Sequence, residues 1–283
     1  MNTELLRRFS DERWEAGVIG LGYVGLPLLL AATRNGLGGI GFDISEPLVQ
    51  ALSGGKSHVD DVANEDLAKA VADGVQFTSD ASDLSRADAL FICVPSPLGR
   101  NRQPDMSYIE AASATITQVA RPGQLIVLES TSYPGTTEEY LLPAIEKAGL
   151  RVDRDVYVAF SPERVSPGDQ LKTAEIPKVV GGVTELSGEV AAAAFRRLVP
   201  SVHKVSSARV AEMAKLLENT YRAVNIGLIN EMAQLAHELG ISIWETVDAA
   251  ATKPFGFQAF YPGPGVGGHC IPLDPPIPCL EGP

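Results

Sequence analysis

Short apolar segments alternate with amphipathic segments from Ala16 to about Val205. The apolar segments are rich in Val, Ile, Leu and Phe, a composition typical of strands that are buried on both faces of a parallel sheet. Several of them lead through turn residues into a helical pattern, and this order favours βα units over hairpins. The sequence therefore predicts an α/β fold built on a doubly wound parallel sheet. The predicted strands are Ala16–Gly20, Gly39–Asp43, Gly74–Phe77, Ala89–Val94, Leu125–Glu129, Val156–Phe160, Lys178–Gly181 and Val202–Val205.

The pattern changes at Ser206. The segment from Ala208 to Gly240 contains no Pro and only one internal Gly, so it predicts a single long helix of about 30 residues that ends at Gly240. A second helix is predicted near Trp244 to Ala250, followed by a segment dense in Pro and Gly. We therefore expect two domains, residues 1–205 around the sheet and residues 206–283 around the long helix.

The long helix carries two faces. Glu212, Lys215, Asn219 and Arg222 follow one another at helical spacing and form a polar face. A separate set of apolar residues recurs at the same spacing, and we expect this set to form a buried side. Its members are Val210, Met213, Leu217, Tyr221, Val224, Leu228, Leu235 and Leu239.

Composition narrows the classes of function. The chain has 283 residues, of which 45% are hydrophobic and 20% charged, the balance of a folded soluble protein. A net charge of −12 argues against a protein that tracks the phosphates of a nucleic acid or binds an anionic membrane. The segment from Met1 to Trp14 is charged throughout, and no apolar run approaches the roughly 18 residues of a membrane helix. We expect neither export nor membrane insertion.

The three cysteines are Cys93, Cys270 and Cys279. They are too few and too scattered for a disulfide framework or a zinc site, which favours a reducing, cytoplasmic location. The four histidines are dispersed and form no cluster with cysteines or aspartates at metal-ligand spacing. We therefore expect no bound metal.

A glycine motif, Gly20-Leu21-Gly22-Tyr23-Val24-Gly25, follows the first predicted strand and opens a helix. The first glycine permits a tight turn, the second lets a pyrophosphate approach, and the third lets helix and strand pack closely. The N-terminus of the helix then presents N–H groups to the anion. The alternative is a glycine turn without a ligand, but the strand and helix on either side favour a Rossmann-like dinucleotide site.

Asp43 ends the second predicted strand, where a carboxylate accepts hydrogen bonds from the adenosine ribose and repels a 2′-phosphate. This predicts NAD rather than NADP as the cofactor. Pro95 and Ser96 end the fourth strand, at the edge where such sheets bind ligands, and are expected to lie beside the cofactor. Cys93, just before them, is expected to be a small core residue.

Cys270 lies in the loop Gly263–Asp274, whose glycines let a ligand approach a thiol closely. A structural cysteine would usually lie in an apolar strand or helix, so this setting favours a reactive thiol. His269 is adjacent, but neighbouring side chains usually point apart, which argues against it as the base. Asp274 and Lys215 are possible partners of the thiol that the sequence cannot place beside it.

Other candidates lie on the long helix and at the strand ends. Lys215 and Asn219, one helical turn apart, could direct an ammonium and an amide at a developing oxyanion, or they could form a solvated helix face. Thr131 and Glu163 follow the fifth and sixth strands, at the ligand-binding edge. The Glu163 carboxylate could activate water, or it could serve as a helix cap or in a salt bridge.

The chain resembles the UDP-glucose/GDP-mannose dehydrogenase family, the nucleotide-sugar 6-dehydrogenases. The resemblance extends over about 255 residues, so it covers most of the chain. The matching segments are residues 20–27, 129–137, 161–168, 211–220 and 225–231 and the loop around Cys270.

This resemblance implies two successive NAD-dependent oxidations, which convert the C6 alcohol of a sugar into a carboxylate by way of a thioester on Cys270. It implies that Lys215 and Asn219 stabilise the oxyanion and that Thr131, Glu163 and Asp274 position or activate water, with Thr131 also beside the cofactor. It also implies a homodimer built on the long helix and a UDP-sugar substrate.

Ser161–Arg164 followed by Pro167-Gly168 resembles the N-acetylhexosamine branch, because the glucose branch has a second glutamate in place of Pro167. Lys253–Phe257 also resembles the UDP-N-acetylglucosamine 6-dehydrogenases. UDP-glucose stays open as an alternative substrate.

Family members continue from the cysteine loop into a second α/β domain that holds much of the nucleotide. Here Pro275–Pro283 differs from the start of that domain, so we expect the chain to lack it. Two alternatives to the dehydrogenase stay open: a non-catalytic remnant that binds NAD and dimerises, and a one-step hydride dehydrogenase in which Cys270 is idle.

Overall fold

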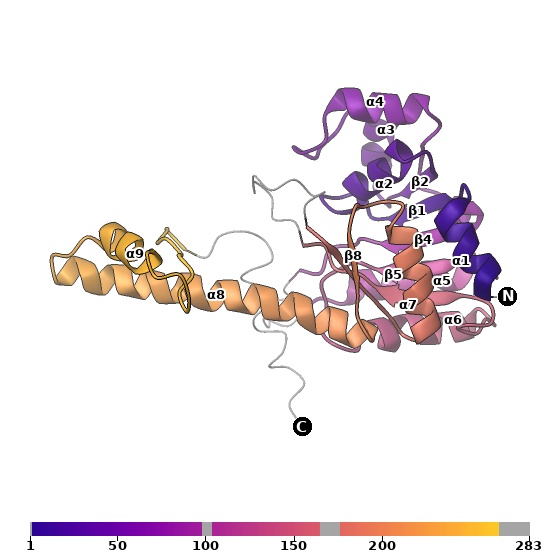
Figure 1. The fold of residues 1–283 in the computed structure, drawn as a ribbon. Helices are drawn as coiled ribbons and strands as arrows, with labels where there is room; N and C mark the ends of the chain where they lie inside the picture. Colours follow the sequence, from indigo (N-terminus) through magenta and orange to yellow (C-terminus); the bar gives the residue numbers. More distant parts are fainter. Residues whose placement is uncertain (1, 98–103, 165–175, 266–283) are drawn as a thin grey trace. The chain divides into compact units, whose positions relative to one another are not determined.

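The computed structural model describes residues 2–97, 104–164 and 176–265, and the side chains from Leu6 onward in those ranges (Figure 1). The chain divides into two compact units, described separately below. The first comprises residues 1–97 and 105–213 and contains the whole sheet. The second comprises residues 98–104 and 214–283. The long helix α8 (Ala208–Glu238) begins in the first unit and continues into the second.

Within the described residues, eight strands form one sheet in the order β3-β2-β1-β4-β5-β6-β7-β8. The α/β fold class and all eight strands predicted from the sequence are confirmed, with shifts of one or two residues at the strand ends. The strands are β1 (Glu15–Ile19), β2 (Gly38–Phe42), β3 (Gln76–Thr78), β4 (Ala89–Ile92), β5 (Leu125–Leu128), β6 (Tyr157–Phe160), β7 (Lys178–Gly182) and β8 (Val202–Lys204).

The direction of one strand differs from the prediction. Every neighbouring pair is parallel except β6 and β7, which are antiparallel, with Phe160 opposite Gly181. The expectation of a wholly parallel sheet is therefore wrong at β7. A strand buried on both faces has the same apolar pattern in either direction, so the sequence carried no signal of the reversal. The reversal places Lys178, the first residue of β7, at the carboxyl ends of β5 and β6.

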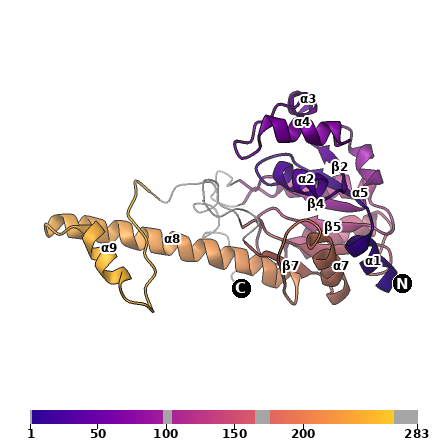
Figure 2. The ribbon, with the colours of Figure 1, turned by 45° about the horizontal axis from the view of Figure 1, so that its top comes forward.

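Helices cover both faces of the sheet, as Figures 1 and 2 show. Side chains of β4 alternate between the two cores, with Ala89 and Phe91 in one and Leu90 and Ile92 in the other. Helices α1, α2, α3, α4 and α7 contribute to the first core, and α5, α6 and the start of α8 to the second. Their bounds are α1 (Asn2–Asp11), α2 (Gly25–Arg34), α3 (Glu46–Ser53), α4 (Asn64–Ala72), α5 (Ser107–Val119), α6 (Leu142–Lys147) and α7 (Glu185–Phe195), with shorter turns η1 (Ala81–Arg86) and η2 (Thr137–Leu141).

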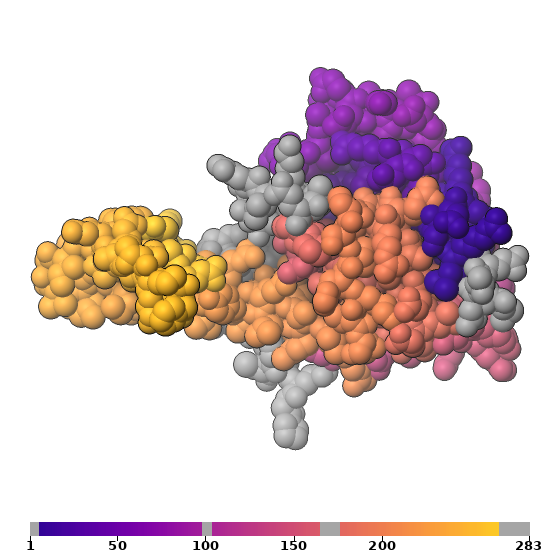
Figure 3. Space-filling view, viewed as in Figure 1, coloured from indigo at the N-terminus to yellow at the C-terminus, as the bar shows by residue number. Residues whose placement is uncertain are grey.

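Helix α1 is absent from the elements predicted from the sequence. The many charged residues of this segment obscure the apolar signal of Phe9 in the sequence. In the structure Phe9 is fully buried and packs edge-on against Trp14, with ring centroids 5.6 Å apart. Figure 3 shows α1 in indigo against the orange surface that includes α7, and the Arg197 guanidinium after α7 donates to the carbonyl oxygen of Ser10. Burial of aromatic side chains stabilises a short helix that would not be stable through helix propensity alone.

Helix α8 confirms the predicted long helix, but its apolar side is not buried. All eight apolar residues expected to form that side are 44% to 65% exposed. Glu212, Lys215 and Asn219, assigned to the polar face, are the buried ones, at 0%, 8% and 2% exposed. The expectation of a buried apolar side is therefore wrong for the single chain, because helical periodicity identifies an apolar face but not what covers it.

The second unit has a small core of its own. Helix α9 (Ile243–Ala251) contributes Val247, and α8 contributes Ala236, which are both buried. Trp244 stacks on Tyr261 with ring centroids 5.8 Å apart, and the Tyr261 hydroxyl donates to the carboxylate of Asp248. In the described ranges no helix combines the length and the apolar character needed to cross a membrane.

Candidate functional site

The three glycines of the loop after β1 differ in what surrounds them. Gly20 has φ +90°, and a Cβ there would lie 2.9 Å from the carbonyl oxygen of Cys93. A Cβ on Gly25 would lie 2.0 Å from the carbonyl oxygen of Gly20, whereas one on Gly22 would meet nothing within 4 Å. The fold itself thus requires Gly20 and Gly25. At Gly22 the backbone is open to a ligand.

Helix α2 begins at this loop, with Gly25 as its first residue and Val24 as its N-cap. In the described chain no side chain caps this end, so the first-turn N–H groups and the helix dipole are available to an anion. Tyr23 is 61% exposed beside them. The geometry is that of a phosphate cradle at a helix N-terminus.

Asp43 lies at the end of β2 and connects two backbone segments. Its Oδ2 accepts a hydrogen bond from the N–H of Leu21 at 3.1 Å, and its Oδ1 accepts one from Ser45 at 3.0 Å. Asp43 therefore fixes the position of the glycine loop relative to the second strand, a contact that the sequence did not predict. Each carboxylate oxygen keeps acceptor capacity for a ribose hydroxyl.

Cys93 and Ser96 lie beyond the end of β4. Cys93 is buried, and burial raises the pKa of its thiol well above the ordinary value. Its expected role as a core residue is confirmed. The Ser96 hydroxyl is buried and has no hydrogen-bond partner within the part of the chain that the structure describes. Pro95, between them, lies at the same edge of the sheet.

The loop after β5 contains Thr131 and is held by Glu212, near the start of α8. Thr131 is half-buried, while Glu212 is fully buried. The Glu212 carboxylate accepts hydrogen bonds from the N–H of Gly135 at 2.6 Å, the N–H of Thr137 at 2.9 Å and the Thr137 hydroxyl at 2.7 Å. Glu212 therefore caps the turn that follows the loop. Burial raises the pKa of Glu212, although these hydrogen bonds oppose the shift.

Glu163 pairs with a buried lysine that the sequence analysis did not select. Lys178 Nζ lies 2.7 Å from Glu129 Oε2 and 3.1 Å from Glu163 Oε2. The Lys178 and Glu129 side chains are 7% and 0% exposed, and the Glu163 side chain is 26% exposed. The salt-bridge alternative for Glu163 is therefore observed, and it leaves the carboxylate partly accessible. A lysine at the start of an otherwise apolar strand was the one available sequence signal.

Charge and burial compete within this cluster. Burial raises the pKa of Glu129 to about 7, an increase that the Lys178 ammonium opposes and the Glu163 carboxylate supports. The pKa of Lys178 is raised as well, because the two carboxylates outweigh the effect of burial, which acts the other way. Lys178 therefore stays charged, and Glu129 is the member that titrates near neutral pH.

Lys215 and Asn219 lie one turn apart on α8, in the second unit, and both are buried. The alternative of a solvated helix face is therefore wrong for these two residues. Cys270 and Asp274 lie outside the described residues. Among the residues that are described, no three His, Cys, Asp or Glu side chains gather as possible metal ligands.

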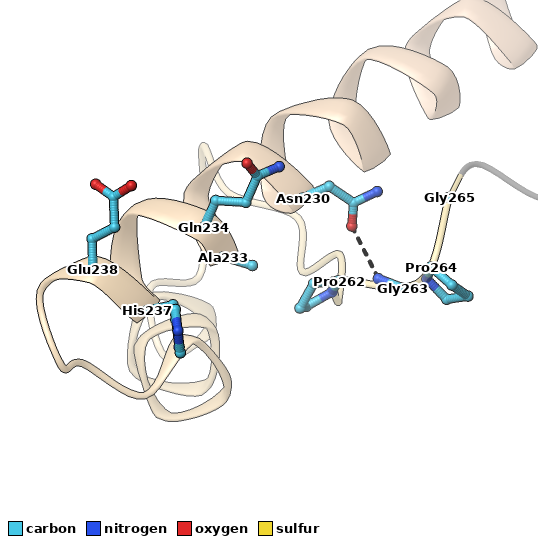
Figure 4. A pocket seen from close by; sticks show the side chains of 9 residues that line it. All are labelled: Asn230, Ala233, Gln234, His237, Glu238, Pro262, Gly263, Pro264 and Gly265. Carbon is cyan, nitrogen blue, oxygen red and sulfur yellow. Dashed lines mark hydrogen bonds between the residues drawn. The ribbon is translucent and has the colours of Figure 1, made fainter.

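The start of the cysteine loop borders an open hollow of about 620 Å³ in the second unit. Figure 4 shows its lining from α8, including Asn230, Gln234 and His237, opposite the segment Pro262–Gly265. The Asn230 side-chain oxygen accepts a hydrogen bond from the N–H of Gly263 at 3.0 Å. This contact holds the first residues of the loop against the helix.

Two family models match the chain. The NAD binding domain of the UDP-glucose/GDP-mannose dehydrogenase family matches residues 15–199, and the central domain of the same family matches residues 209–277. The chain belongs to the UDP-glucose/GDP-mannose dehydrogenase family. The predicted cofactor, NAD, is confirmed by the first match, and the glycine loop, α2 and Asp43 all lie inside it.

The family's curated relatives include Protein CapL of Staphylococcus aureus, 42% identical over 91% of this chain. A UDP-N-acetyl-D-glucosamine 6-dehydrogenase of Pseudomonas aeruginosa is 39% identical over 92% of this chain. The chain spans about 60% of the length of these relatives. A solved UDP-D-ManNAc dehydrogenase of Pyrococcus horikoshii is similar with a TM-score of 0.86 at 37% identity, over 92% of this chain and 63% of that one.

The titration of Glu129 predicts how the stability of this family member depends on pH. The pKa of Glu129 is raised from 4.5 to about 7 on folding, so between these values the folded chain keeps a proton that the unfolded chain releases. The free energy of unfolding therefore falls as pH rises from about 4.5 to about 7, by an amount on the order of 3 kcal/mol from this group. We expect Glu129→Gln to remove this part of the decline, as measured by urea unfolding at several pH values.

Glu212 contributes a decline of its own, because its pKa is also raised. The informative quantity is thus the difference between the wild-type and Glu129→Gln curves. Glu65→Gln, at an exposed position on α4, is the control and should follow the wild-type curve. Parallel curves for wild type and Glu129→Gln would contradict the assignment.

Proposed function

We propose that this chain supplies the NAD-binding and central domains, residues 1–205 and 206–283, of an NAD-dependent nucleotide-sugar 6-dehydrogenase. The reaction oxidises the C6 hydroxyl of a UDP-sugar to the carboxylate, and the substrate we propose is UDP-N-acetylglucosamine. One observation supports it most: an open phosphate cradle and a partly accessible carboxylate, Glu163, belong to one sheet of a chain in this family.

The substrate proposal rests on the relatives and on the branch motif. One relative is named a UDP-N-acetyl-D-glucosamine 6-dehydrogenase and others are named UDP-N-acetyl-D-mannosamine dehydrogenases. A solved UDP-glucose dehydrogenase of Pyrobaculum islandicum is 28% identical. We therefore place UDP-N-acetylglucosamine first and its mannosamine isomer and UDP-glucose as the alternatives. The few, scattered cysteines favour the cytoplasm as the location.

In this proposal the glycine loop and α2 bind the pyrophosphate of NAD, Asp43 binds the ribose, and Pro95, Ser96 and Thr131 lie beside the nicotinamide end. NAD, when bound, accepts the hydride that leaves the sugar carbon in each oxidation. The residues of the chain orient the sugar and manage protons and developing charge around that carbon.

Lys215 and Asn219 donate hydrogen bonds to the oxygen on the reacting carbon, and their burial strengthens these bonds. The Cys270 thiolate adds to the aldehyde, and loss of the second hydride leaves a thioester. Water, positioned by Thr131, Glu163 and Asp274, then hydrolyses the thioester and releases the carboxylate and the thiol. Each sugar therefore gives up two hydrides, one to each of two NAD molecules, and takes up one water.

We also propose a homodimer built on α8. The eight exposed apolar residues recur along one face of the helix as an apolar stripe, and a continuous exposed apolar face of this kind is typical of a protein–protein interface. A second copy would cover this stripe with the same stripe, as a two-fold interface requires.

The open environment of Gly22 predicts a selective effect of one methyl group. We expect Gly22→Ala to weaken NAD binding at least tenfold, because the new Cβ occupies the space where the pyrophosphate approaches. Its melting temperature should stay within about 2 °C of wild type, since the methyl meets no protein atom. Isothermal titration with NAD and thermal unfolding measure the two effects.

Gly227→Ala is the matched control, because a Cβ there also meets nothing within 4 Å. It lies on α8, away from the glycine loop in the sequence, and should leave the affinity for NAD unchanged. An unchanged dissociation constant in Gly22→Ala would show that the cofactor does not bind at this loop.

The reaction is tested by the number of NADH molecules formed. We expect two NADH for each UDP-N-acetylglucosamine consumed, measured by absorbance with the product identified by mass spectrometry. Cys270→Ser should block product formation, since an ester replaces the thioester. Cys93→Ala, which changes a buried thiol outside the proposed chemistry, should remain active.

Full activity of Cys270→Ser with one NADH per sugar would favour the one-step hydride dehydrogenase. NAD binding and dimerisation without any turnover would favour a second candidate, a non-catalytic module. The share of the relatives' length that the chain spans, about 60%, is the observation that keeps this candidate open.

The dimer is tested by placing charge on the apolar stripe. We expect the double variant Leu217→Glu, Leu228→Glu to sediment as a monomer at concentrations where wild type is a dimer, because two carboxylates would be buried against their counterparts. Gln234→Glu, about 100° around the helix from the stripe, should leave the dimer intact. A wild-type monomer in analytical ultracentrifugation would overturn the proposal.

A further inference from the structure

The reversal of β7 brings a cation to an edge that otherwise carries carboxylates. Lys178 begins β7 and is held from the β8 side by its backbone N–H, which donates to the carbonyl oxygen of Ser201 at 2.9 Å. Its ammonium extends between Glu129, which follows β5, and Glu163, which follows β6. Three neighbouring strands thus converge on one buried ion cluster at the carboxyl edge.

We propose that Lys178 is a positioning residue for the water-activating carboxylate: its ammonium keeps Glu163 ionised and fixed in direction, while Glu129 anchors the ammonium from the buried side. This inference rests on the proposed function for the role of Glu163. It assigns to Lys178 and Glu129 a task that is distinct from contact with the sugar or with NAD.

The contacts of Glu163 support this assignment. Its Oε2 is 3.1 Å from the Lys178 ammonium, and its Oε1 accepts a hydrogen bond from the N–H of Arg164 at 2.8 Å. The Arg164 guanidinium in turn donates to the carbonyl oxygen of Pro177, the residue before Lys178. Each carboxylate oxygen therefore has a fixed donor, and the side chain is still 26% exposed. A base held in this way has a defined direction from which water can approach.

The groups around the ammonium determine which member of the cluster titrates. Lys178 faces the carboxylates of Glu129 and Glu163 and the ring of Phe195 from α7, whose centroid is 5.6 Å from the ammonium. Burial and the charge of Glu129 raise the pKa of the Cys93 thiol, after β4, and the Lys178 charge opposes that shift. Glu129 is the most deeply buried, and its Oε1 has no hydrogen-bond partner in the described part of the chain. Burial accordingly raises the pKa of Glu129 to about 7, which makes Glu129 the proton acceptor that this burial favours.

The test is the titration of the two carboxyl groups in the 283-residue chain, without NAD or sugar. With ¹³C-labelled glutamate side chains, Glu163→Gln and Glu129→Gln assign the two resonances. We expect Lys178→Met to raise the titration midpoint of Glu163 by at least about one pH unit, because two carboxylates then share the site without a cation. Lys178→Arg keeps the charge and should hold the midpoint within a few tenths of a unit.

Lys204→Met is the matched control. Lys204, at the end of β8, also binds two carboxylates, those of Glu185 and Glu189 on α7, and neither belongs to the Lys178 cluster. Its loss should leave the titrations of Glu129 and Glu163 unchanged. A Glu163 midpoint in Lys178→Met equal to that of wild type would overturn the inference.

If Lys178→Met does not fold, Glu163→Gln decides the question, since it keeps both buried members of the cluster. The inference then requires the Glu129 midpoint to fall when the neighbouring negative charge is removed, and an unchanged midpoint overturns it. Because this titration needs no turnover, its failure leaves the dehydrogenase proposal standing. Failure of the NADH assay, conversely, does not alter the titration.

Discussion

The ion pairs of the buried Lys178 ammonium with Glu129 and Glu163 hold the charged groups at the carboxyl edge of the sheet in place. Glu129 is fully buried at this edge, and a buried carboxylate without a partner costs several kcal/mol. The ammonium offsets that cost for Glu129 and, on its other side, holds Glu163 at the protein surface. It can reach both only because β7 is antiparallel to β6, so that the start of one strand lies beside the end of its neighbour.

Helix α8 presents the opposite of a usual amphipathic helix in a single chain. Three of its polar residues, Glu212, Lys215 and Asn219, are buried, while its apolar stripe is exposed. Glu212 explains how the polar side is tolerated at the beginning of the helix, since its carboxylate accepts two backbone N–H groups and one hydroxyl. Burial of such a group without these donors would be unfavourable, so the loop after β5 and the first turn of α8 must fold together.

The sequence predicted the fold well where the signal is local. Strands buried on both faces stand out as apolar runs, and the glycine motif is recognisable because its three glycines follow one another at a fixed spacing between a strand and a helix. Helix α1 was not predicted, because the residues around Phe9 are charged and the rings that it packs with lie elsewhere in the core. The antiparallel direction of β7 was not predicted, because the apolar pattern of a strand is the same in both directions.

The buried ion pairs and hydrogen-bonded carboxylates were not predicted either, because their partners are far apart in the sequence. Lys178 and Glu129 are 49 positions apart and Glu212 and Thr137 are 75 apart, so neither pair forms a motif that spacing alone reveals. The apolar stripe of α8 was recognised as a face, yet a period of 3.6 residues is the same whether the partner is the chain's own core or another surface. Contacts between distant segments, rather than local preferences, set the charge and direction of the groups proposed for chemistry.

We expect the two parts of the proposed activity, NAD binding and water activation by Glu163, to respond differently to substitution. In the proposed activity, NAD binds at a loop whose backbone geometry depends on Gly20, Gly25 and Asp43. The proposed control of Glu163 by Lys178 depends on β5, β6 and β7 being held in register with one another. A change that loosens β7 would therefore disturb the carboxylates first and leave the dinucleotide loop intact, since β1 and β2 do not pair with β7. We therefore expect cofactor affinity and the pH dependence of the proposed water activation to be separable properties of one sheet.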